Sequence, residues 1–220
     1  MIKLASRDLF ARSSKSMFYR FMLGVAHWLV FPFLRLFNRV EITGIDHIPE
    51  QGAFVLAANH LSFWDPVYLF CCVHRKLNFM AKAELFQVPV VGWVIAHVHG
   101  FPVRRNTIDR NALKISAEVL AQGEALVLFP EGTRSRSGEL LPFYDGAVLF
   151  AQRSKAVVIP VAIINTPKSF PAGFRQKVLL RFGEPIDFSD YQGKKVNSTM
   201  LHQMTDQLRC RIKQLQEGNS

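Results

Sequence analysis

The sequence predicts an α/β fold with a mixed, largely parallel central sheet, flanked by helices and preceded by an N-terminal helical segment at a membrane interface. Apolar runs of strand length recur at 53–58, 124–129 and 156–164, and their near-continuous apolar character is typical of strands buried on both faces. Segments with helical spacing of apolar residues separate these runs, as in a parallel sheet with crossover helices. The first 39 residues are basic and contain an apolar stretch of their own.

Residues 1–39 form the predicted N-terminal segment, and residues 40–220 form the predicted α/β domain. The first 40 residues hold seven Lys and Arg against one acidic residue, so they carry +6 of the chain's net charge of +10. The apolar stretch 21–34 is shorter than the roughly 20 residues that a helical membrane span requires. His27 and Pro32 also interrupt it. We therefore expect a helix that lies at the interface, with a tilted span as the second possibility.

The basic charge fits either nucleic acid or anionic lipid as a partner. Trp28 and Phe31 lie among the basic residues of this segment, which favours a membrane surface with anionic lipids, and no nucleic-acid partner is expected. Arg35 and Arg39 follow the apolar stretch where a signal peptide would have a small-residue cleavage site, which argues against cleavage. Lys and Arg near a membrane favour the cytoplasmic face, so we expect peripheral or monotopic attachment there.

Apolar patterning and turn residues predict the elements of the α/β domain. The predicted strands cover 40–44, 53–58, 77–80, 101–103, 124–129, 156–164 and 177–182. The predicted helices cover 66–73, 107–122, 146–153 and the residues from 199 onward. Residues 84–99 predict a broken helix. Packing of its large apolar residues in the core is the simpler expectation, and an apolar surface near the membrane is the alternative. Pro160 removes a ladder donor from its strand, so a local break or an edge position is expected there.

His60 and Asp65 follow the buried strand 53–58 and lie five positions apart. An imidazole at a strand end can take a proton from an alcohol, while a carboxylate on its other nitrogen fixes the tautomer and stabilises the imidazolium. Two plainer interpretations compete with this one. Asp65 followed by Pro66 is a good helix start, with Asp as the N-cap, and His60 alone could be a structural histidine.

Residues 130–135, which follow the strand 124–129, combine a glycine turn, a hydroxyl and a guanidinium in the sequence Pro-Glu-Gly-Thr-Arg-Ser. Backbone N–H groups and the Thr133 hydroxyl can donate to an anion, and the fork of Arg134 matches a phosphate. The plainer interpretation is a polar turn with a solvated arginine. The sequence thus indicates an anion-binding corner at the end of a second buried strand.

Four motifs in a fixed order resemble those of the glycerolipid acyltransferase family of the His-x-x-x-x-Asp type, over roughly residues 40 to 185. The motifs are Asn59-His60-x-x-x-x-Asp65, Gly100-Phe-Pro-Val-Arg104-Arg105, Phe129-Pro-Glu131-Gly132-Thr133-Arg134-Ser135 and Val158-Ile-Pro-Val-Ala162. Phe-Pro-Glu-Gly-Thr-Arg-Ser at a strand end is the most specific of them. The family usually has a lysine in a following Phe-Lys-x-Gly pattern, where this chain reads Phe143-Tyr144-Asp145-Gly146, so this chain lacks a positive charge that would help to bind the phosphate or the acyl donor.

The resemblance implies an O-acyltransferase that moves a fatty acyl group to the sn-2 hydroxyl of a lysophosphatidate in phospholipid synthesis. His60 would be the base and Asp65 its orienting carboxylate. Arg104, Arg105 and Arg134 would hold the phosphate, Gly132 and Thr133 would shape the turn, and Glu131 would hydrogen-bond the glycerol or the neighbouring arginines. Glycerol-3-phosphate, a lyso-ornithine lipid or another lysophospholipid remains an alternative acceptor.

Metal and nucleotide motifs are absent from the sequence, including His-Glu-x-x-His, paired Cys-x-x-Cys and Gly-x-Gly-x-x-Gly. Cys71, Cys72 and Cys210 have no metal-ligand spacing. We expect no metal and no bound cofactor, with acyl-CoA or acyl carrier protein as a cosubstrate. A non-catalytic basic membrane adaptor is the alternative from a different class, and the intact His60 and Asp65 argue against it.

Overall fold

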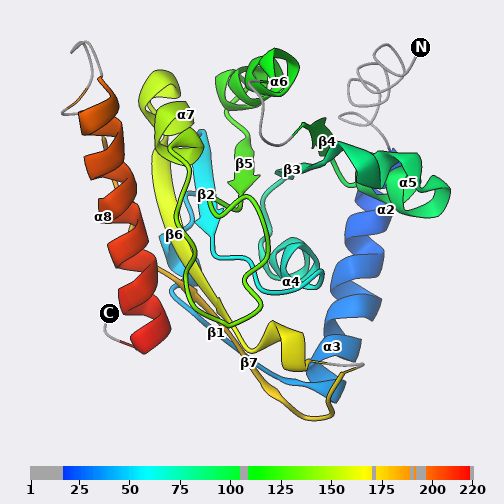
Figure 1. The fold of residues 1–220 in the computed structure, drawn as a ribbon. Helices are drawn as coiled ribbons and strands as arrows, with labels where there is room; N and C mark the ends of the chain where they lie inside the picture. Colours follow the sequence, from blue (N-terminus) through cyan, green and yellow to red (C-terminus); the bar gives the residue numbers. More distant parts are fainter. Residues whose placement is uncertain (1–16, 105–108, 170–171, 189–190, 192–196, 219–220) are drawn as a thin grey trace.

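The computed structural model describes residues 17–104, 109–169, 172–188, 191 and 197–218. They form a seven-stranded sheet with helices on both sides (Figure 1). The strands are β1 (Arg39–Thr43), β2 (Phe54–Ala58), β3 (Leu77–Lys82), β4 (Gly100–Val103), β5 (Ala125–Leu128), β6 (Val157–Ile164) and β7 (Lys177–Phe182). The α-helices are α2 (Met17–Val25), α3 (Phe31–Phe37), α4 (Asp65–Cys72), α5 (Pro89–His97), α6 (Arg110–Ala121), α7 (Gly146–Ser154) and α8 (Ser198–Glu217).

The strand order is β1-β7-β6-β2-β5-β3-β4, and every neighbouring pair is parallel except β6 with β7. The predicted mixed, largely parallel sheet is therefore confirmed. The five strands from β6 to β4 run in one direction, so their carboxyl ends meet at one edge of the sheet. The segments that follow β2, β4, β5 and β6 all start at this edge, which is where open α/β sheets place their ligands.

Each face of the sheet carries its own hydrophobic core, as the alternating side chains of buried strands require. On one face, Leu56 and Ile159 pack with α4 and the N-terminal helices. On the other face, Val55 and Val158 pack with α6, α7 and α8. Figure 1 shows α7 and α8 on one side of the sheet and α4, α2 and α3 on the other. Both layers support the central strand β2.

The N-terminal helical run is longer than the apolar stretch 21–34 suggested. The helix α2, the π-helical turn η1 (Ala26–Val30) and α3 follow one another directly. Pro32 cannot donate the backbone hydrogen bond of an α-helix, and the π turn just before it lets Phe31 N–H bond Ala26 O, five residues back. Among the described residues there is one helical run long and apolar enough to cross a membrane, Tyr19–Phe37.

This helical run has two apolar faces. One face buries Tyr19, Ala26 and Leu34, which join the same core as α4. The other face leaves large apolar side chains exposed, namely Met17, Phe21, Trp28, Leu29 and Leu36. The N-terminal segment is therefore packed on the α/β domain while it presents an apolar stripe to the outside.

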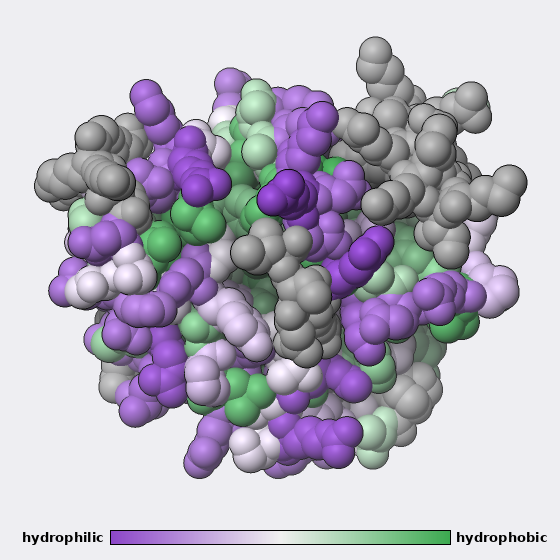
Figure 2. Space-filling view, turned by 45° about the horizontal axis from the view of Figure 1, so that its top comes forward, coloured by the Kyte–Doolittle hydropathy of each residue, from purple (hydrophilic) through white to green (hydrophobic). Residues whose placement is uncertain are grey.

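The expected broken helix at 84–99 is present as a 3₁₀ turn (Ala83–Gln87) followed by α5. The expectation that its large residues pack in the core was wrong, because Val88, Val90, Val91, Trp93 and Val94 are all exposed. Apolar composition alone does not distinguish a buried helix from an exposed apolar one. On the face of the molecule seen in Figure 2, hydrophobic residues lie in small patches among hydrophilic ones.

Pro160 lies in β6, an interior strand, and it coincides with the expected local break. The antiparallel ladder pairs Val161 with Phe182, and beyond Pro160 it resumes as a single bridge between Val158 and Ile186, one residue out of register. On the other side of the strand, Pro160 pairs with Ala57 of β2 in the parallel register. The missing N–H is tolerated because the ladder to β7 shifts at this point.

Candidate active site

His60 and Asp65 form a hydrogen-bonded pair at the carboxyl end of β2. The Nδ1 atom of His60 lies 2.7 Å from Asp65 Oδ2. An ionised carboxylate can only accept, so Nδ1 carries the proton and Nε2 keeps its lone pair. The side chain of Asp65 is fully buried and that of His60 is 12% exposed. Among the described residues nothing hydrogen-bonds Nε2, which leaves it available to a substrate proton.

Asp65 does not cap α4, so the simpler interpretation of this residue was wrong. The N-cap position of α4 is Trp64, and no side chain caps it. Asp65 Oδ2 instead accepts from the backbone amides of Leu61 at 2.6 Å and Ser62 at 2.8 Å, and Oδ1 accepts from the Thr166 hydroxyl at 2.5 Å. These donors all lie outside the helix, and they turn the carboxylate toward His60.

The segments after β2 and β5 fix the position of His60. Its ring stacks on Phe129, with ring centres 4.1 Å apart and planes 25° apart. Its backbone N–H donates to Glu131 Oε1 at 2.8 Å, and its carbonyl accepts from Ser135 N–H at the same distance. On the β6 side, Asn59 forms a two-point bond with Ile163, at 2.9 and 2.7 Å. His60 is therefore held from the ends of both strands that neighbour β2.

Glu131 is buried beneath the turn, with 3% of its surface exposed. Its second oxygen accepts from Leu141 N–H at 3.1 Å. Burial raises the pKa of its carboxyl, while the amide donors of His60 and Leu141 act in the opposite direction. Both oxygens thus bond backbone amides rather than the neighbouring arginines, and the expected bond to glycerol remains a prediction. In this structure Glu131 ties the loops of the two motifs together.

Gly132 shapes the turn after β5, which the sequence predicts to bind an anion. Its φ of +64° is in the left-handed region that glycine tolerates, and its N–H bonds Phe129 O at 2.9 Å. The Tyr144 ring lies against it, so close that an added Cβ would be 2.8 Å from the ring. Tyr144 is exposed at this turn, whereas Asp145 points to α8, where its carboxylate accepts from Thr205 Oγ1 at 2.7 Å.

Thr133 and Arg134 are exposed beyond the turn. The guanidinium carbon of Arg134 lies 3.6 Å from the ring centre of Phe63, which belongs to the loop between His60 and Asp65. A cation over an aromatic face is attracted by the quadrupole of the ring. The structure therefore brings the arginine of the 129–135 motif to the loop of the 59–65 motif.

Arg104 is exposed at the end of β4, and its backbone N–H donates to Asp109 at 3.1 Å. Two strands, β5 and β3, separate β4 from β2. At about 4.8 Å between neighbouring strands, its backbone is roughly 14 Å from the end of β2. Arg104 thus lies on the same edge of the sheet as His60, but farther away than Arg134. The predicted Arg105 lies outside the described residues.

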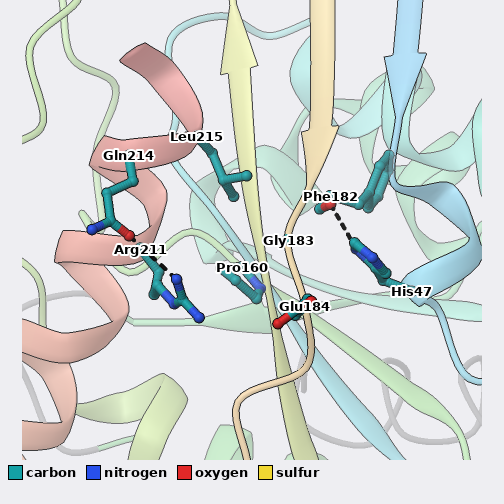
Figure 3. Close-up of a pocket in the computed structure, with 8 residues that line it drawn as sticks. All are labelled: His47, Pro160, Phe182, Gly183, Glu184, Arg211, Gln214 and Leu215. Atoms are coloured by element: carbon teal, nitrogen blue, oxygen red, sulfur yellow. Dashed lines mark hydrogen bonds between the residues drawn. The ribbon is translucent and has the colours of Figure 1, made fainter. Parts of the chain in front are cut away.

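Two cavities lie away from these residues. One, of about 350 Å³, is bordered by Pro160, Gly183 and Arg211 between β6, β7 and α8 (Figure 3). The other, of about 420 Å³, is bordered by Phe143, His202 and Arg209. Neither is lined by His60 or Asp65. Within the described part of the chain no cluster of three metal-ligating side chains occurs.

The sequence analysis did not identify Thr166 as a residue of the site. It quoted Phe129 as part of a motif but did not predict that its ring stacks on His60. Thr166 comes soon after the apolar strand 156–164, so its position after a buried parallel strand was a usable signal. What the sequence lacks is the adjacency of β6 and β2, which brings Thr166 to Asp65 across 101 positions of the chain.

Comparison with known proteins gives matches over most of the chain. A family profile described as Acyltransferase matches residues 39–164. The chain is 30% identical to the 1-acyl-sn-glycerol-3-phosphate acyltransferase of Streptococcus pneumoniae over 204 residues, 91% of this chain and 74% of that protein. It is 32% identical to the Bacillus subtilis protein of the same name over 185 residues, 83% of this chain and 91% of that protein.

A solved structure also matches. The crystal structure of the 1-acyl-sn-glycerophosphate (LPA) acyltransferase, PlsC, from Thermotoga maritima has a TM-score of 0.72 and 26% sequence identity to this chain. The alignment covers 99% of this chain and 89% of that one. The likeness thus includes the N-terminal helical run as well as the sheet.

Proposed function

Because this chain belongs to the acyltransferase family, we propose that it moves a fatty acyl group from acyl-CoA or acyl carrier protein to the sn-2 hydroxyl of 1-acyl-glycerol-3-phosphate, giving phosphatidate. The observation that carries this proposal is the His60–Asp65 pair, with Nδ1 on the carboxylate and Nε2 unoccupied among the described residues. The names of the relatives support the choice of acceptor.

In the proposed reaction, Nε2 of His60 accepts the proton of the sn-2 hydroxyl as its oxygen attacks the thioester carbonyl carbon. The tetrahedral intermediate then collapses, the C–S bond breaks, and the imidazolium returns the proton to the departing sulfur. Asp65 stabilises the imidazolium between these two steps. The sequence has no Gly-x-Ser-x-Gly elbow, which favours direct transfer from donor to acceptor without an acyl-enzyme. The thioester is a cosubstrate, and no bound cofactor is required.

The phosphate of the acceptor would bind Arg134 and Thr133, on the turn that Gly132 shapes. Arg134 is the best placed of these because its guanidinium lies over Phe63, inside the His60–Asp65 loop. Arg104 would approach the same anion from the end of β4, and Arg105 remains a predicted phosphate ligand. Holding the alcohol and the base in one geometry can lower the barrier by several kcal/mol.

We further propose that the protein works on the cytoplasmic face of a membrane with anionic lipids. The N-terminal helical run exposes Trp28, Leu29 and Leu36 on one face while its other face packs on the domain. A helix packed along the domain cannot leave it to cross the bilayer without losing that contact, which favours an interfacial position over a span. Exposed Val90 and Val91 of α5 offer further apolar contact. The acceptor and the product are both membrane lipids, so attachment at the membrane surface would bring the active site to its substrate.

The test is an acyltransferase assay with purified protein, one acyl thioester and a panel of acceptors. We expect turnover with 1-acyl-glycerol-3-phosphate and a loss of about 10²- to 10⁴-fold in His60→Ala. Asp65→Asn should also lose activity, because an amide cannot stabilise the imidazolium. A rate in His60→Ala equal to that of the parent would refute the mechanism. Faster turnover of glycerol-3-phosphate, a lyso-ornithine lipid or another lysophospholipid would refute the proposed acceptor while leaving the chemistry intact.

A further inference from the structure

The two oxygens of the buried Asp65 carboxylate are bonded unequally. Oδ2 accepts three hydrogen bonds, from His60 Nδ1 and from the amides of Leu61 and Ser62. Oδ1 accepts one, from the Thr166 hydroxyl at 2.5 Å. No lysine or arginine pairs with Asp65 among the described residues. A fully buried charge needs such donors, and Thr166 is the donor that satisfies Oδ1.

Thr166 is itself held in one place. It starts a short 3₁₀ turn directly after Asn165, which has a left-handed φ of +66°, and it is fully buried. Its carbonyl accepts from the Ser169 hydroxyl at 2.7 Å and from the Ser169 amide at 3.1 Å. The hydroxyl of Thr166 therefore meets Asp65 from a buried turn that is closed by its own hydrogen bonds.

The end of β6, just before Thr166, also forms hydrogen bonds with the residue that precedes His60. Ile163, at the end of β6, bonds both amide atoms of the Asn59 side chain, and Asn59 directly precedes His60. The end of β6 thus contacts the catalytic loop at two points, one before His60 and one at Asp65. These contacts join segments about 100 positions apart in the chain.

We propose that Thr166 is a positioning residue of the acyltransferase reaction, which holds the Asp65 carboxylate so that Oδ2 faces His60 Nδ1 and the lone pair of Nε2 faces the substrate. This inference rests on the proposed role of His60 as the base. Without the hydroxyl, Oδ1 would be a buried acceptor with no partner, and the carboxylate would rotate or bind a proton. Either change would weaken its support of the imidazolium.

The first test compares Thr166→Val, which has nearly the same shape but no hydroxyl, with Thr166→Ser, which keeps it. We expect kcat to fall about 10- to 100-fold in the valine variant, as for a lost hydrogen bond to a charged group. KM for both substrates should stay nearly unchanged, and serine should restore most of kcat. The acid limb of the kcat/KM profile should move to lower pH in the valine variant, because an imidazolium that Asp65 stabilises less well loses its proton at lower pH.

Thr205→Val is the matched control, because Thr205 makes the same kind of hydrogen bond to Asp145 at 2.7 Å in another part of the molecule. We expect its kcat and pH profile to equal those of the parent. If Thr166→Val does not fold, Thr166→Ser and Thr166→Cys still give the test, because the weaker S–H donor should leave a lower kcat. Equal kcat in the parent and in Thr166→Val, or equal loss in the serine and valine variants, would overturn the proposal.

Two further measurements separate this proposal from the proposed function. In an Asp65→Asn background, Thr166→Val should cause almost no additional loss, since the two residues act as one unit. The NMR signal of the His60 Nδ1 proton reports the pair without any substrate, and it should move in Thr166→Val but not in Thr205→Val. An inactive parent enzyme would refute the proposed function, whereas an unmoved signal would refute the role of Thr166.

Discussion

At the scale of single residues, the site combines two buried carboxylates that have different tasks. Asp65 bonds the imidazole that would accept the proton, whereas Glu131 bonds two backbone amides and joins the loops after β2 and β5. Both are satisfied by hydrogen bonds instead of by arginines, which leaves the arginine of the turn available to the substrate. The position of that arginine depends on Phe63, and this dependence can be tested.

Phe63→Leu keeps an apolar side chain at this position but removes the aromatic face under Arg134. We expect KM for lysophosphatidate to rise about two- to fivefold, the range of an exposed cation–π contact, with kcat almost unchanged. Steady-state kinetics with varied acceptor measures the effect. Phe174→Leu is the control, because Phe174 is similarly exposed, at 62% against 65%, but its ring packs near Phe37. A KM that stays at the parent value in Phe63→Leu would contradict this role.

At the scale of elements, the turn after β5 depends on one glycine. Gly132 has a left-handed φ, and the Tyr144 ring fills the space where a side chain would lie. Gly138, in the same loop, also has a left-handed φ, but an added Cβ would meet no atom within 4 Å. Substitution of either glycine would strain the backbone, but only substitution of Gly132 would also cause a steric clash with a neighbouring side chain. Comparing the two variants therefore distinguishes the two effects.

We expect Gly132→Ala and Gly138→Ala each to lower the free energy of unfolding by about 1 kcal/mol, because both force alanine to a positive φ. Only Gly132→Ala should also raise KM for the acceptor, since its methyl group would displace Tyr144 or shift the turn that carries Arg134. Thermal unfolding and acceptor kinetics measure the two effects. Adding Tyr144→Ala to Gly132→Ala should remove the part of the KM increase that comes from the contact with the Tyr144 ring. Equal changes in KM in Gly132→Ala and Gly138→Ala would contradict a steric effect at Gly132.

The elements also show why part of the structure could be predicted and part could not. Apolar runs such as 53–58 predicted buried strands because a strand covered on both faces has few polar positions. The turn 130–135 was predicted from local chemistry, and Gly132 adopts the backbone that such a turn requires. Strand order depends on contacts between distant segments, so the sequence alone could not place Thr166 beside Asp65 or Arg104 two strands from β2. The exposure of α5 could not be decided from the sequence, because an apolar composition fits a buried helix and an exposed one alike.

At the scale of the whole molecule, the direction of the strands determines where function can lie. The carboxyl ends of β2 and β5 are adjacent, so His60 and the turn 130–135 meet at one edge of the sheet. The N-terminal helical run packs on the α4 side of the sheet and belongs to the same core as β2. The proposed membrane attachment and catalysis would therefore share one packed core, and the exposed face of the helix can be changed without removing core residues.

Truncation of the N-terminal helices would remove core residues such as Leu34, which is fully buried. Surface substitution is the sharper test. In the combined variant Trp28→Ser, Leu29→Ser and Leu36→Ser, the three replaced side chains are 86%, 67% and 70% exposed. We expect its affinity for vesicles of phosphatidylglycerol and phosphatidylcholine to fall by roughly 100-fold, because partial burial of three large apolar side chains contributes about 3 kcal/mol.

Vesicle sedimentation at about 0.1 M and about 1 M salt measures this affinity and separates apolar from ionic attraction, since the higher salt shortens the Debye length to about 3 Å. The parent protein should stay bound to the vesicles at the higher salt concentration, because salt does not screen apolar contact. The combined variant should dissociate at that salt concentration. Ile45→Ser, on a partly exposed turn after β1, is the control and should bind like the parent. Turnover of a short-chain, water-soluble lysophosphatidate should be the same in all three proteins, because the site itself is unchanged. Parent-like vesicle binding by the combined variant would show that this helix face does not contact the membrane.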